Sequence, residues 1–145
     1  MAANGLISVP SDFGPQETLE RLERVLGERG LTIFALIDHG AGARDAGLQL
    51  SPTQVIIFGN ARAGTLLMQA NQTIGIDLPL KVLIWTDAAG KTWFAYDDPA
   101  WLARRHGLGP ATNATVAAMA AGLAEFAKVA TSRVAAPHQQ KGTTK

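Results

Sequence analysis

His39 has the side chain and the position that a reactive site requires. It follows Asp38 at the end of an apolar run, and the glycines at 40 and 42 would let a ligand approach the backbone closely. An imidazole there can serve near neutral pH as a general base, a hydrogen-bond donor or a metal ligand. The alternative is structural, with His39 bracing the turn through a backbone carbonyl. The residue types and their spacing are compatible with both interpretations.

A second polar group, made of Asn60, Gly64 and Thr65, follows the apolar run 55–58. It lies where a strand is expected to end and a helix to begin, so free backbone N–H groups and the helix dipole would favour an anion. The string Gly-Asn-Ala-Arg-Ala-Gly-Thr matches neither the phosphate-loop pattern nor the dinucleotide fingerprint. The alternative is again structural, with Asn60 in a turn and Thr65 as a helix cap.

Asp77 is a carboxylate in the otherwise apolar stretch 74–80. If it is buried, it must be paired or hydrogen-bonded, and the partners that we consider are Arg44, Lys81 and His39. A pair with His39 would supply the base and the orienting or second acid group of a hydrolase or isomerase. A structural ion pair is the simpler explanation.

Hydrophobic periodicity indicates the elements that must position these residues. It predicts strands at 6–9, 31–37, 55–58, 80–86 and 91–96, and helices at 16–29, 64–70, 100–106 and 112–132. The unbroken apolar run 55–58 predicts a central strand covered on both faces. The loop 87–90 suits a hairpin between the last two strands. We therefore predict the α+β class, as a single two-layer domain with a mixed or antiparallel sheet covered by helices and an additional C-terminal helix.

The composition fits one folded domain over residues 1–133, followed by a flexible tail at 134–145. The 145 residues are 47% hydrophobic and 17% charged, which is too apolar for a disordered chain. Thirteen Lys and Arg against 12 Asp and Glu give a net charge of +1, and no basic cluster stands out. Nucleic acid is therefore not an expected partner.

Neither thiol chemistry nor a bound metal is expected. The chain has no cysteine, and its three histidines lack metal-ligand spacing. We therefore predict no metal site and no cofactor. The N-terminal residues lack the basic and apolar regions of a signal peptide, and no apolar run approaches the ~20 residues that span a bilayer. The expected location is cytoplasmic, without a membrane partner.

The C-terminal helix suggests self-association. Val116, Met119, Leu123 and Phe126 recur at alternating spacings of three and four, which forms an apolar seam. The low charged content also favours a shared surface, and a homodimer is the commonest closed oligomer. The competing explanation is that the helix packs onto the sheet of its own chain.

Several strings of the sequence resemble the family catalogued as Domain of Unknown Function 302. The resemblance covers roughly residues 5–108 and is carried by Ile37-Asp38-His39, Ala41-Gly42-Ala43-Arg44, Phe58-Gly59-Asn60, Gly64-Thr65, Asp77-Leu78-Pro79-Leu80-Lys81, Asp98-Pro99 and Arg105-His106-Gly107-Leu108. It implies a small α+β domain in which the recurring polar positions form the walls of one cleft. It implies no established activity, cofactor or partner.

The function that these observations favour is the binding of a small molecule or anion in a polar cleft. The ligand contacts would come from His39, Arg44, Asn60, Gly64 and Thr65. This hypothesis requires that His39, Asn60, Thr65 and Asp77 face one pocket. The alternatives are a hydrolase or isomerase that uses His39 and Asp77, and a structural or interaction module in which the polar residues only hold turns.

Overall fold

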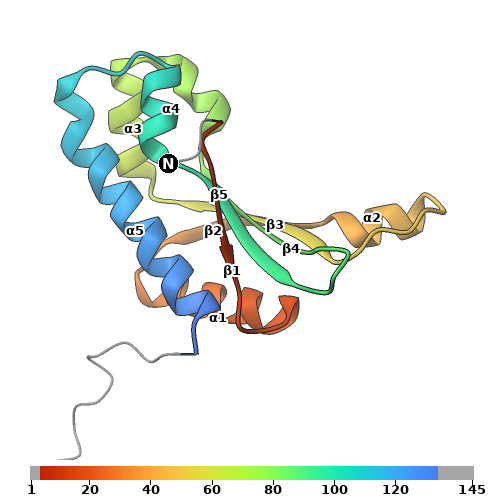
Figure 1. Ribbon diagram of the computed structural model, residues 1–145. Coiled ribbons are helices and arrows are strands. Elements are labelled where there is room, and N and C mark those ends of the chain that lie inside the picture. The colour runs from red at the N-terminus through yellow and green to blue at the C-terminus, as the bar shows by residue number, and fades with distance from the viewer. Residues whose placement is uncertain (1–3, 134–145) are drawn as a thin grey trace, which may run out of the picture.

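Five antiparallel strands form one sheet in the computed structural model, which describes residues 4–133 (Figure 1). Across the sheet the strands are β1 (Leu6–Pro10), β5 (Thr92–Asp97), β4 (Leu80–Thr86), β3 (Thr53–Gly59) and β2 (Thr32–Asp38). β1 and β2 are therefore the edge strands. The α+β class is confirmed, and the sheet is antiparallel throughout. The tail expected at 134–145 lies outside the described residues.

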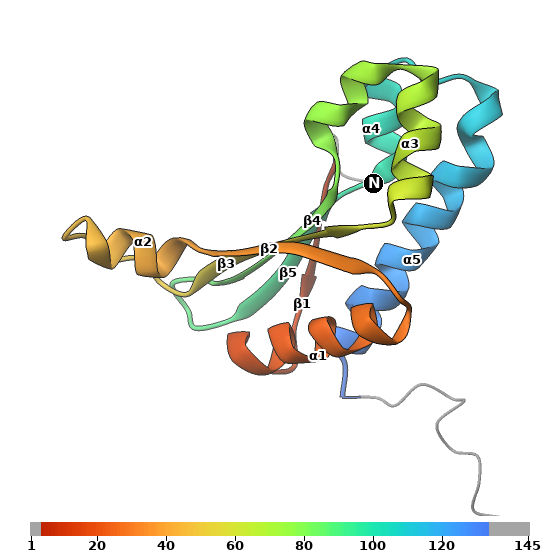
Figure 2. The same cartoon turned by 180° about the vertical axis from the view of Figure 1, so that it is seen from behind.

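The helices lie on one face of the sheet and at its two ends. They are α1 (Pro15–Glu28), α2 (His39–Asp45), α3 (Ala61–Ala70), α4 (Pro99–Arg105) and α5 (Asn113–Thr131), with the short 3-10 helices η1 (Gln72–Asp77) and η2 (Pro110–Thr112). α1 and α5 lie along one face of the sheet, as Figure 2 shows from behind. α3, η1 and α4 gather beyond one end of the sheet, whereas α2 projects from the other end.

The main core lies between the sheet and the pair α1 and α5. α1 is amphipathic, and its buried apolar residues recur at the helical period: Leu19, Leu22, Val25 and Leu26. On α5, Leu123, Phe126 and Ala130 join the same cluster. The rings of Phe126 and Phe58 meet edge to face with their centroids 6.1 Å apart. Full burial of a side chain of this size contributes about 1.5–3 kcal/mol, so this packing holds both helices against the sheet.

The apolar seam of α5 is used inside the chain. Leu123 and Phe126 belong to the main core, and Val116 and Met119 pack in a second cluster with α3, η1 and α4. By length and composition alone, the helix from Pro110 to Thr131 could cross a membrane. A third of that apolar window is buried inside the domain. The competing explanation for the seam, packing within the chain, is therefore the one observed.

The start of α3 differs from the expectation. The helix begins at Ala61 and not at Gly64, because the side-chain oxygen of Asn60 accepts hydrogen bonds from the amides of Arg62 (2.9 Å) and Ala63 (3.2 Å). Gly64 and Thr65 therefore lie within the helix, and Thr65 is not its cap. An asparagine at this position is among the best N-caps, because it satisfies amides that have no partner inside the helix.

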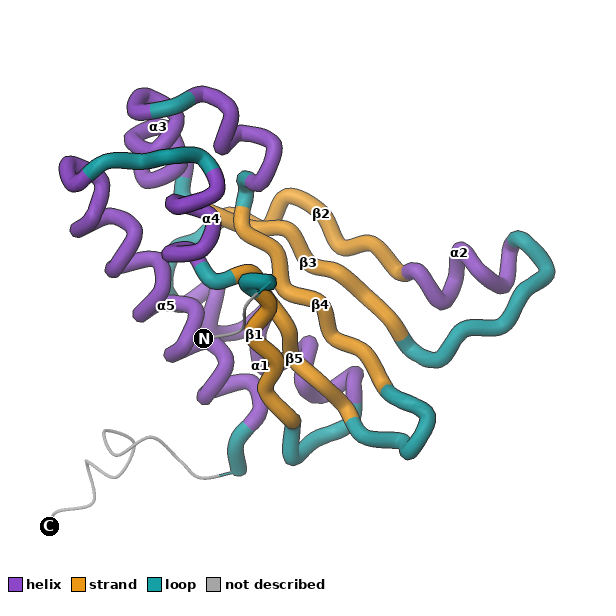
Figure 3. Tube along the Cα trace, turned by 45° about the horizontal axis from the view of Figure 1, so that its top comes forward, coloured by secondary structure: helices purple, strands orange, loops and turns teal. Residues whose placement is uncertain are grey.

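The expectation of a strand covered on both faces is also wrong. β3 is indeed interior, since it pairs with β2 and β4. Ile56 and Phe58 point into the core and are buried, whereas Val55 and Ile57 point to the other face and stay partly exposed. In the described part of the chain, no helix lies over that second face (Figure 3). Periodicity alone could not distinguish an apolar face that is covered from one that is open.

Candidate functional site

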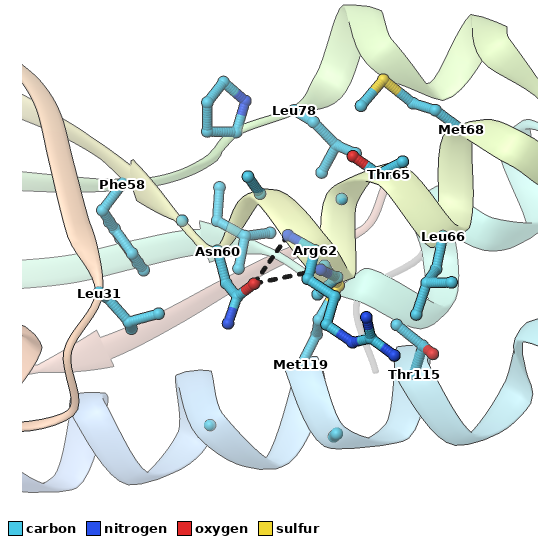
Figure 4. A pocket seen from close by; sticks show the side chains of 18 of the residues that line it. Leu31, Phe58, Asn60, Arg62, Thr65, Leu66, Met68, Leu78, Thr115 and Met119 are labelled. Atoms are coloured by element: carbon cyan, nitrogen blue, oxygen red, sulfur yellow. Dashed lines mark hydrogen bonds between the residues drawn. The ribbon is translucent and has the colours of Figure 1, made fainter.

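A groove opens where the end of β3 meets α3 and the first half of α5 (Figure 4). Its volume is about 720 Å³, within the 300–1,000 Å³ range that is typical of small-molecule sites. Its walls come from segments that are far apart in the sequence, namely residues 58–68, 75–80 and 114–126, with Arg29, Leu31 and Phe34 at one side. The groove therefore depends on the complete fold.

Small residues on two helices keep the groove open. Ala61 and Gly64 line it from α3, and Ala114, Ala118 and Gly122 line it from α5. A Cβ added at Gly64 would lie 3.7 Å from Cδ1 of Leu78, which is ordinary van der Waals contact. A larger side chain at any of these positions would take up volume that is now empty.

The interior of the groove is apolar. The buried rings of Phe58 and Phe126 line it, together with Leu78, Met68 and Met119. Methionine is unbranched and polarisable, so it adapts to ligands of different shapes. The polar cleft that the sequence suggested is therefore a predominantly apolar groove with polar groups at its border.

Two arginines stand at that border. The guanidinium of Arg29 lies 3.6 Å from a carboxylate oxygen of Glu125 and 5.9 Å from the ring centre of Phe126. Arg62 extends from α3 toward Thr115 on α5 (Figure 4). Among residues 4–133, no carboxylate lies within ion-pair distance of Arg62. Arg62 was not among the expected ligand contacts, because one arginine between two alanines gives no motif.

The amides at the start of α3 are already bonded. Those of Arg62 and Ala63 donate to the Asn60 side chain, and that of Gly64 donates to the Asn60 carbonyl oxygen. The anion-binding loop expected here therefore lacks three of its donors. Asn60, Gly64 and Thr65 nevertheless all line the groove.

The structure does not bring His39 to this group. Asp38 pairs with Gln54 near the start of β3, whereas Asn60 follows its last residue, so about 20 Å of strand separate the two ends. His39 is exposed on the projecting α2 and lines neither the groove nor the smaller hollow nearby. The expected convergence of His39, Asn60, Thr65 and Asp77 is therefore not formed.

Arg44 also lies at the far end of the sheet. It borders a hollow of about 270 Å³ together with Asp38, Gln54 and Leu50. Asp38 is occupied there, since its carboxylate accepts from the amide of Ala41 (2.9 Å) and from the Gln54 side chain (3.3 Å). This polar cluster caps α2 and fastens it to β3.

Asp77 is paired, but mainly with Arg105 and His106, which were not among its expected partners. Its carboxylate lies 2.6 Å from Nε2 of His106 and accepts two hydrogen bonds from Arg105, at 2.8 and 3.0 Å. Nδ1 of His106 lies 2.9 Å from the Thr73 hydroxyl. Lys81, a partner that was considered, reaches only the backbone carbonyl of Asp77, at 3.3 Å. The arrangement joins η1 to the end of α4.

The signal for these partners was present in the sequence. The string Arg105-His106-Gly107-Leu108 is one of those that carry the family resemblance, although its chemistry was not used. The separation of 29 residues between Asp77 and His106 gives no local pattern. The structural ion pair is the interpretation of Asp77 that the geometry favours.

The fold and the groove define a small α+β domain with an apolar groove at one end of its sheet. The model of the family described as "Domain of unknown function DUF302" matches residues 7–126. The chain belongs to this family. The match extends beyond the expected limit near residue 108 and takes in the part of α5 that lines the groove.

The chain is also similar to longer proteins with another name and to a solved structure of the same family. The chain is 46% identical over 127 residues to proteins named "Fluoride-specific ion channel FluC 1" from Brucella suis biovar 1 and Brucella abortus biovar 1. The match takes in 88% of this chain but only 50% and 47% of those proteins, so the chain spans about half their length. The crystal structure of an uncharacterized conserved DUF302 protein from Bacillus stearothermophilus has the same fold, with a TM-score of 0.78 at 22% identity over 88% of this chain and 99% of that one.

Proposed function

We propose that the groove binds a small amphipathic molecule with an aliphatic body and an anionic head group. The observation that carries this proposal is the combination of an apolar interior of about 720 Å³ with an arginine at its border, Arg62, that has no carboxylate partner in residues 4–133. An aliphatic chain would gain about 0.8 kcal/mol for each methylene group that it buries. A carboxylate or phosphate would meet the guanidinium, whose planar donors suit such groups.

The geometry gives less support to the acid/base alternative. A hydrolase or isomerase that used His39 with Asp77 would need the two side chains within hydrogen-bond reach of one substrate. His39 is the first residue of α2, which projects from one end of the sheet (Figure 1). Asp77 is the last residue of η1, which lies beyond the other end. The two residues therefore do not form a pair that could act on one molecule.

The relatives named as fluoride channels are about twice as long as the region that matches this chain. Our proposal for this chain does not include transport of fluoride. Fluoride instead provides a useful control, because it is an anion without an aliphatic body. We expect it to leave the stability of the protein unchanged at concentrations where an amphipathic carboxylate stabilises it.

Thermal unfolding tests the proposal. We would measure the melting temperature with straight-chain carboxylates of six to fourteen carbons, with decanol and decylamine, and with fluoride. A ligand at about 100 times its Kd stabilises a protein by about 2.7 kcal/mol, which corresponds to several degrees for a chain of this length. We expect the shift to grow with chain length up to the capacity of the groove, and to be larger for decanoate than for decanol or decylamine.

Arg62→Gln should reduce the preference for decanoate over decanol and leave the response to decanol nearly unchanged. Arg24→Gln is the matched control, since Arg24 is exposed on α1 and does not line the groove. If no carboxylate shifts the melting temperature, or if the shift is the same in the Arg62 variant, the proposed function is wrong.

A further inference from the structure

A β-bulge in the edge strand β2 places the ring of Phe34 at the groove. Ile33 pairs with Phe58 and Ala35 pairs with Ile57, so Phe34 is the extra residue between them. Bulges are frequent next to functional sites, where they redirect a side chain. Phe34 lines the groove and is 55% exposed. β2 therefore contributes to the groove an aromatic ring that a ligand can reach.

Gly59 leaves the space beside that ring open. A Cβ built at Gly59 would lie 3.9 Å from Cε2 of Phe34 and 3.4 Å from Cβ of Pro79. A side chain at this position would therefore occupy space next to both rings. Gly59 and Pro79 line the groove together with Phe34. The C–H group at Cε2 of Phe34 thus remains uncovered on this side.

A second glycine, Gly122 on α5, has the same effect on Phe126. A Cβ built at Gly122 would lie 3.9 Å from Cε2 and 4.0 Å from Cζ of that ring, and both residues line the groove. Elsewhere the Phe126 ring is packed within the chain, since it meets Phe58 edge to face and lies 5.9 Å from the guanidinium of Arg29. The Cε2 and Cζ atoms are therefore the part of this ring that is left for a ligand.

Phe58 brings these two rings to the same end of the groove. It lies on β3 across from the bulge that contains Phe34, and its ring centroid is 6.1 Å from that of Phe126. Thr115, which Arg62 approaches, precedes Phe126 on α5 by eleven residues, or about 16 Å of helix. The phenylalanines and the arginine proposed for the head group thus lie at opposite ends of the groove.

The uncovered C–H groups of Phe34 and Phe126 suit the face of another aromatic ring. The edge of a phenyl ring is partially positive and its face is partially negative, so aromatic rings prefer to meet edge to face. Such a contact contributes beyond the burial of apolar area, and a saturated ring does not obtain it. The thioethers of Met68 and Met119, which line the same groove, also make favourable contacts with aromatic rings.

We propose that the ligand of the groove carries an aromatic ring at the end opposite its anionic head, and that Phe34 and Phe126 hold this ring. The ligand class is therefore an arylalkyl carboxylate or phosphate. This inference rests on the proposed function for the head group at Arg62 and adds the group at the other end. Phe34 is thus a specificity-determining residue, because its ring selects an aromatic end over a saturated one of similar size.

Calorimetric titration with three carboxylates of twelve carbons tests the inference. They are ω-phenylhexanoate, ω-cyclohexylhexanoate and dodecanoate. The saturated ring has more apolar surface than the phenyl ring, so a groove that selected only apolar area would favour it. We expect instead that the wild type binds ω-phenylhexanoate at least about threefold more tightly than ω-cyclohexylhexanoate, because of the edge-to-face contacts.

Phe34→Leu keeps an apolar side chain and removes the ring. The variant should fold, because Phe34 is an exposed residue. Its preference for the phenyl over the cyclohexyl ligand should fall at least about twofold, whereas its affinity for dodecanoate should change little. Phe13→Leu is the matched control, since Phe13 packs against Arg21 at 4.0 Å and does not line the groove. The control should keep the full preference.

Gly122→Ala covers the Phe126 ring with one methyl group. The methyl group would be in ordinary van der Waals contact with the ring, and alanine is a better helix former than glycine, so the variant should fold. It should also lower the phenyl preference. Gly27→Ala is the control, because Gly27 lies on α1, does not line the groove and has no described atom within 4 Å of a Cβ built there. Circular dichroism shows whether each variant is folded.

The possible results separate this inference from the proposed function. If dodecanoate binds but the wild type shows no phenyl preference, or if folded Phe34→Leu keeps the full preference, the inference is wrong and the proposed function stands. If no carboxylate binds, the proposed function is wrong. Titration of ω-phenylhexanol and ω-cyclohexylhexanol then tests the ring site without an anionic head. A phenyl preference that depends on Phe34 would support the inference, and equal or absent binding would overturn it.

Discussion

The carboxylate of Asp77 and the imidazole of His106 are hydrogen-bonded at 2.6 Å although 29 residues separate them in the chain. The exposed fractions of the two side chains are 15% and 7%, so water screens the contact only weakly. The bond joins η1, which contributes Gly75 to the groove wall, to the end of α4. Asp77 is thus a residue that holds one side of the groove in place.

Replacement of Asp77 by alanine should therefore destabilise the protein. The change leaves the buried ring nitrogen of His106 and the guanidinium of Arg105 without their acceptor, which costs about 1–3 kcal/mol. Urea unfolding followed by circular dichroism measures the loss. Asp45→Ala is the control, because Asp45 is exposed at the end of α2 and should change the stability by less than about 0.5 kcal/mol. Equal effects of the two variants would show that the Asp77 contacts contribute nothing.

Asn60 is expected to act through the helix that it caps. Asn60→Ala removes the acceptor of two amides and should cost about 1 kcal/mol of stability. Asn60→Asp keeps a cap of similar strength and should be nearly neutral. Urea unfolding of the two variants tests whether the side-chain oxygen of Asn60 stabilises the protein as a helix cap. The capping account fails if the aspartate variant is as unstable as the alanine variant.

The hairpin loop between β4 and β5 contains an acid-sensitive contact. The indole N–H of Trp93 and then the amide of Lys91 lower the pKa of Asp87 below its ordinary value of 3.8. A lowered pKa in the folded state gives stability that is present above pH 3.8 and is lost as the pH falls through the folded-state value. The difference in unfolding free energy between the wild type and Asp87→Asn should therefore narrow below pH 3.8. A difference that stays constant down to pH 2.5 would contradict this assignment.

Most of the fold could be predicted from local patterns. The amphipathic period of α1 and the loop 87–90 between two apolar runs each determine a local structure, and both were predicted correctly. The start of α3 was predicted incorrectly. Gly64 resembles a helix boundary, but the helix begins after Asn60, which is the stronger cap. The order of the strands and the openness of one sheet face depend on long-range packing, which periodicity does not contain.

The candidate site was harder to predict for the same reason. Asn60, Gly64 and Thr65 were expected to lie near one another and do line one groove. His39 and Asp77 were assigned to them because all lie at element ends, but an antiparallel sheet has two ends, and sequence alone does not say which end each residue reaches. The apolar lining of the groove was not predicted, because residues such as Met119 and Phe126 have the sequence pattern of ordinary core residues.

Calorimetric titration of decanoate is the most direct test of the proposed groove. The wild type should bind with one site for each chain. Ala118→Trp should weaken binding by at least about tenfold, which is 1.4 kcal/mol, because the indole fills the groove. Ala117→Trp is the matched control, since Ala117 is exposed on the same helix but does not line the groove, and its affinity should equal that of the wild type. No heat of binding in the wild type, or equal affinities in folded Ala118→Trp and wild-type protein, would contradict the account.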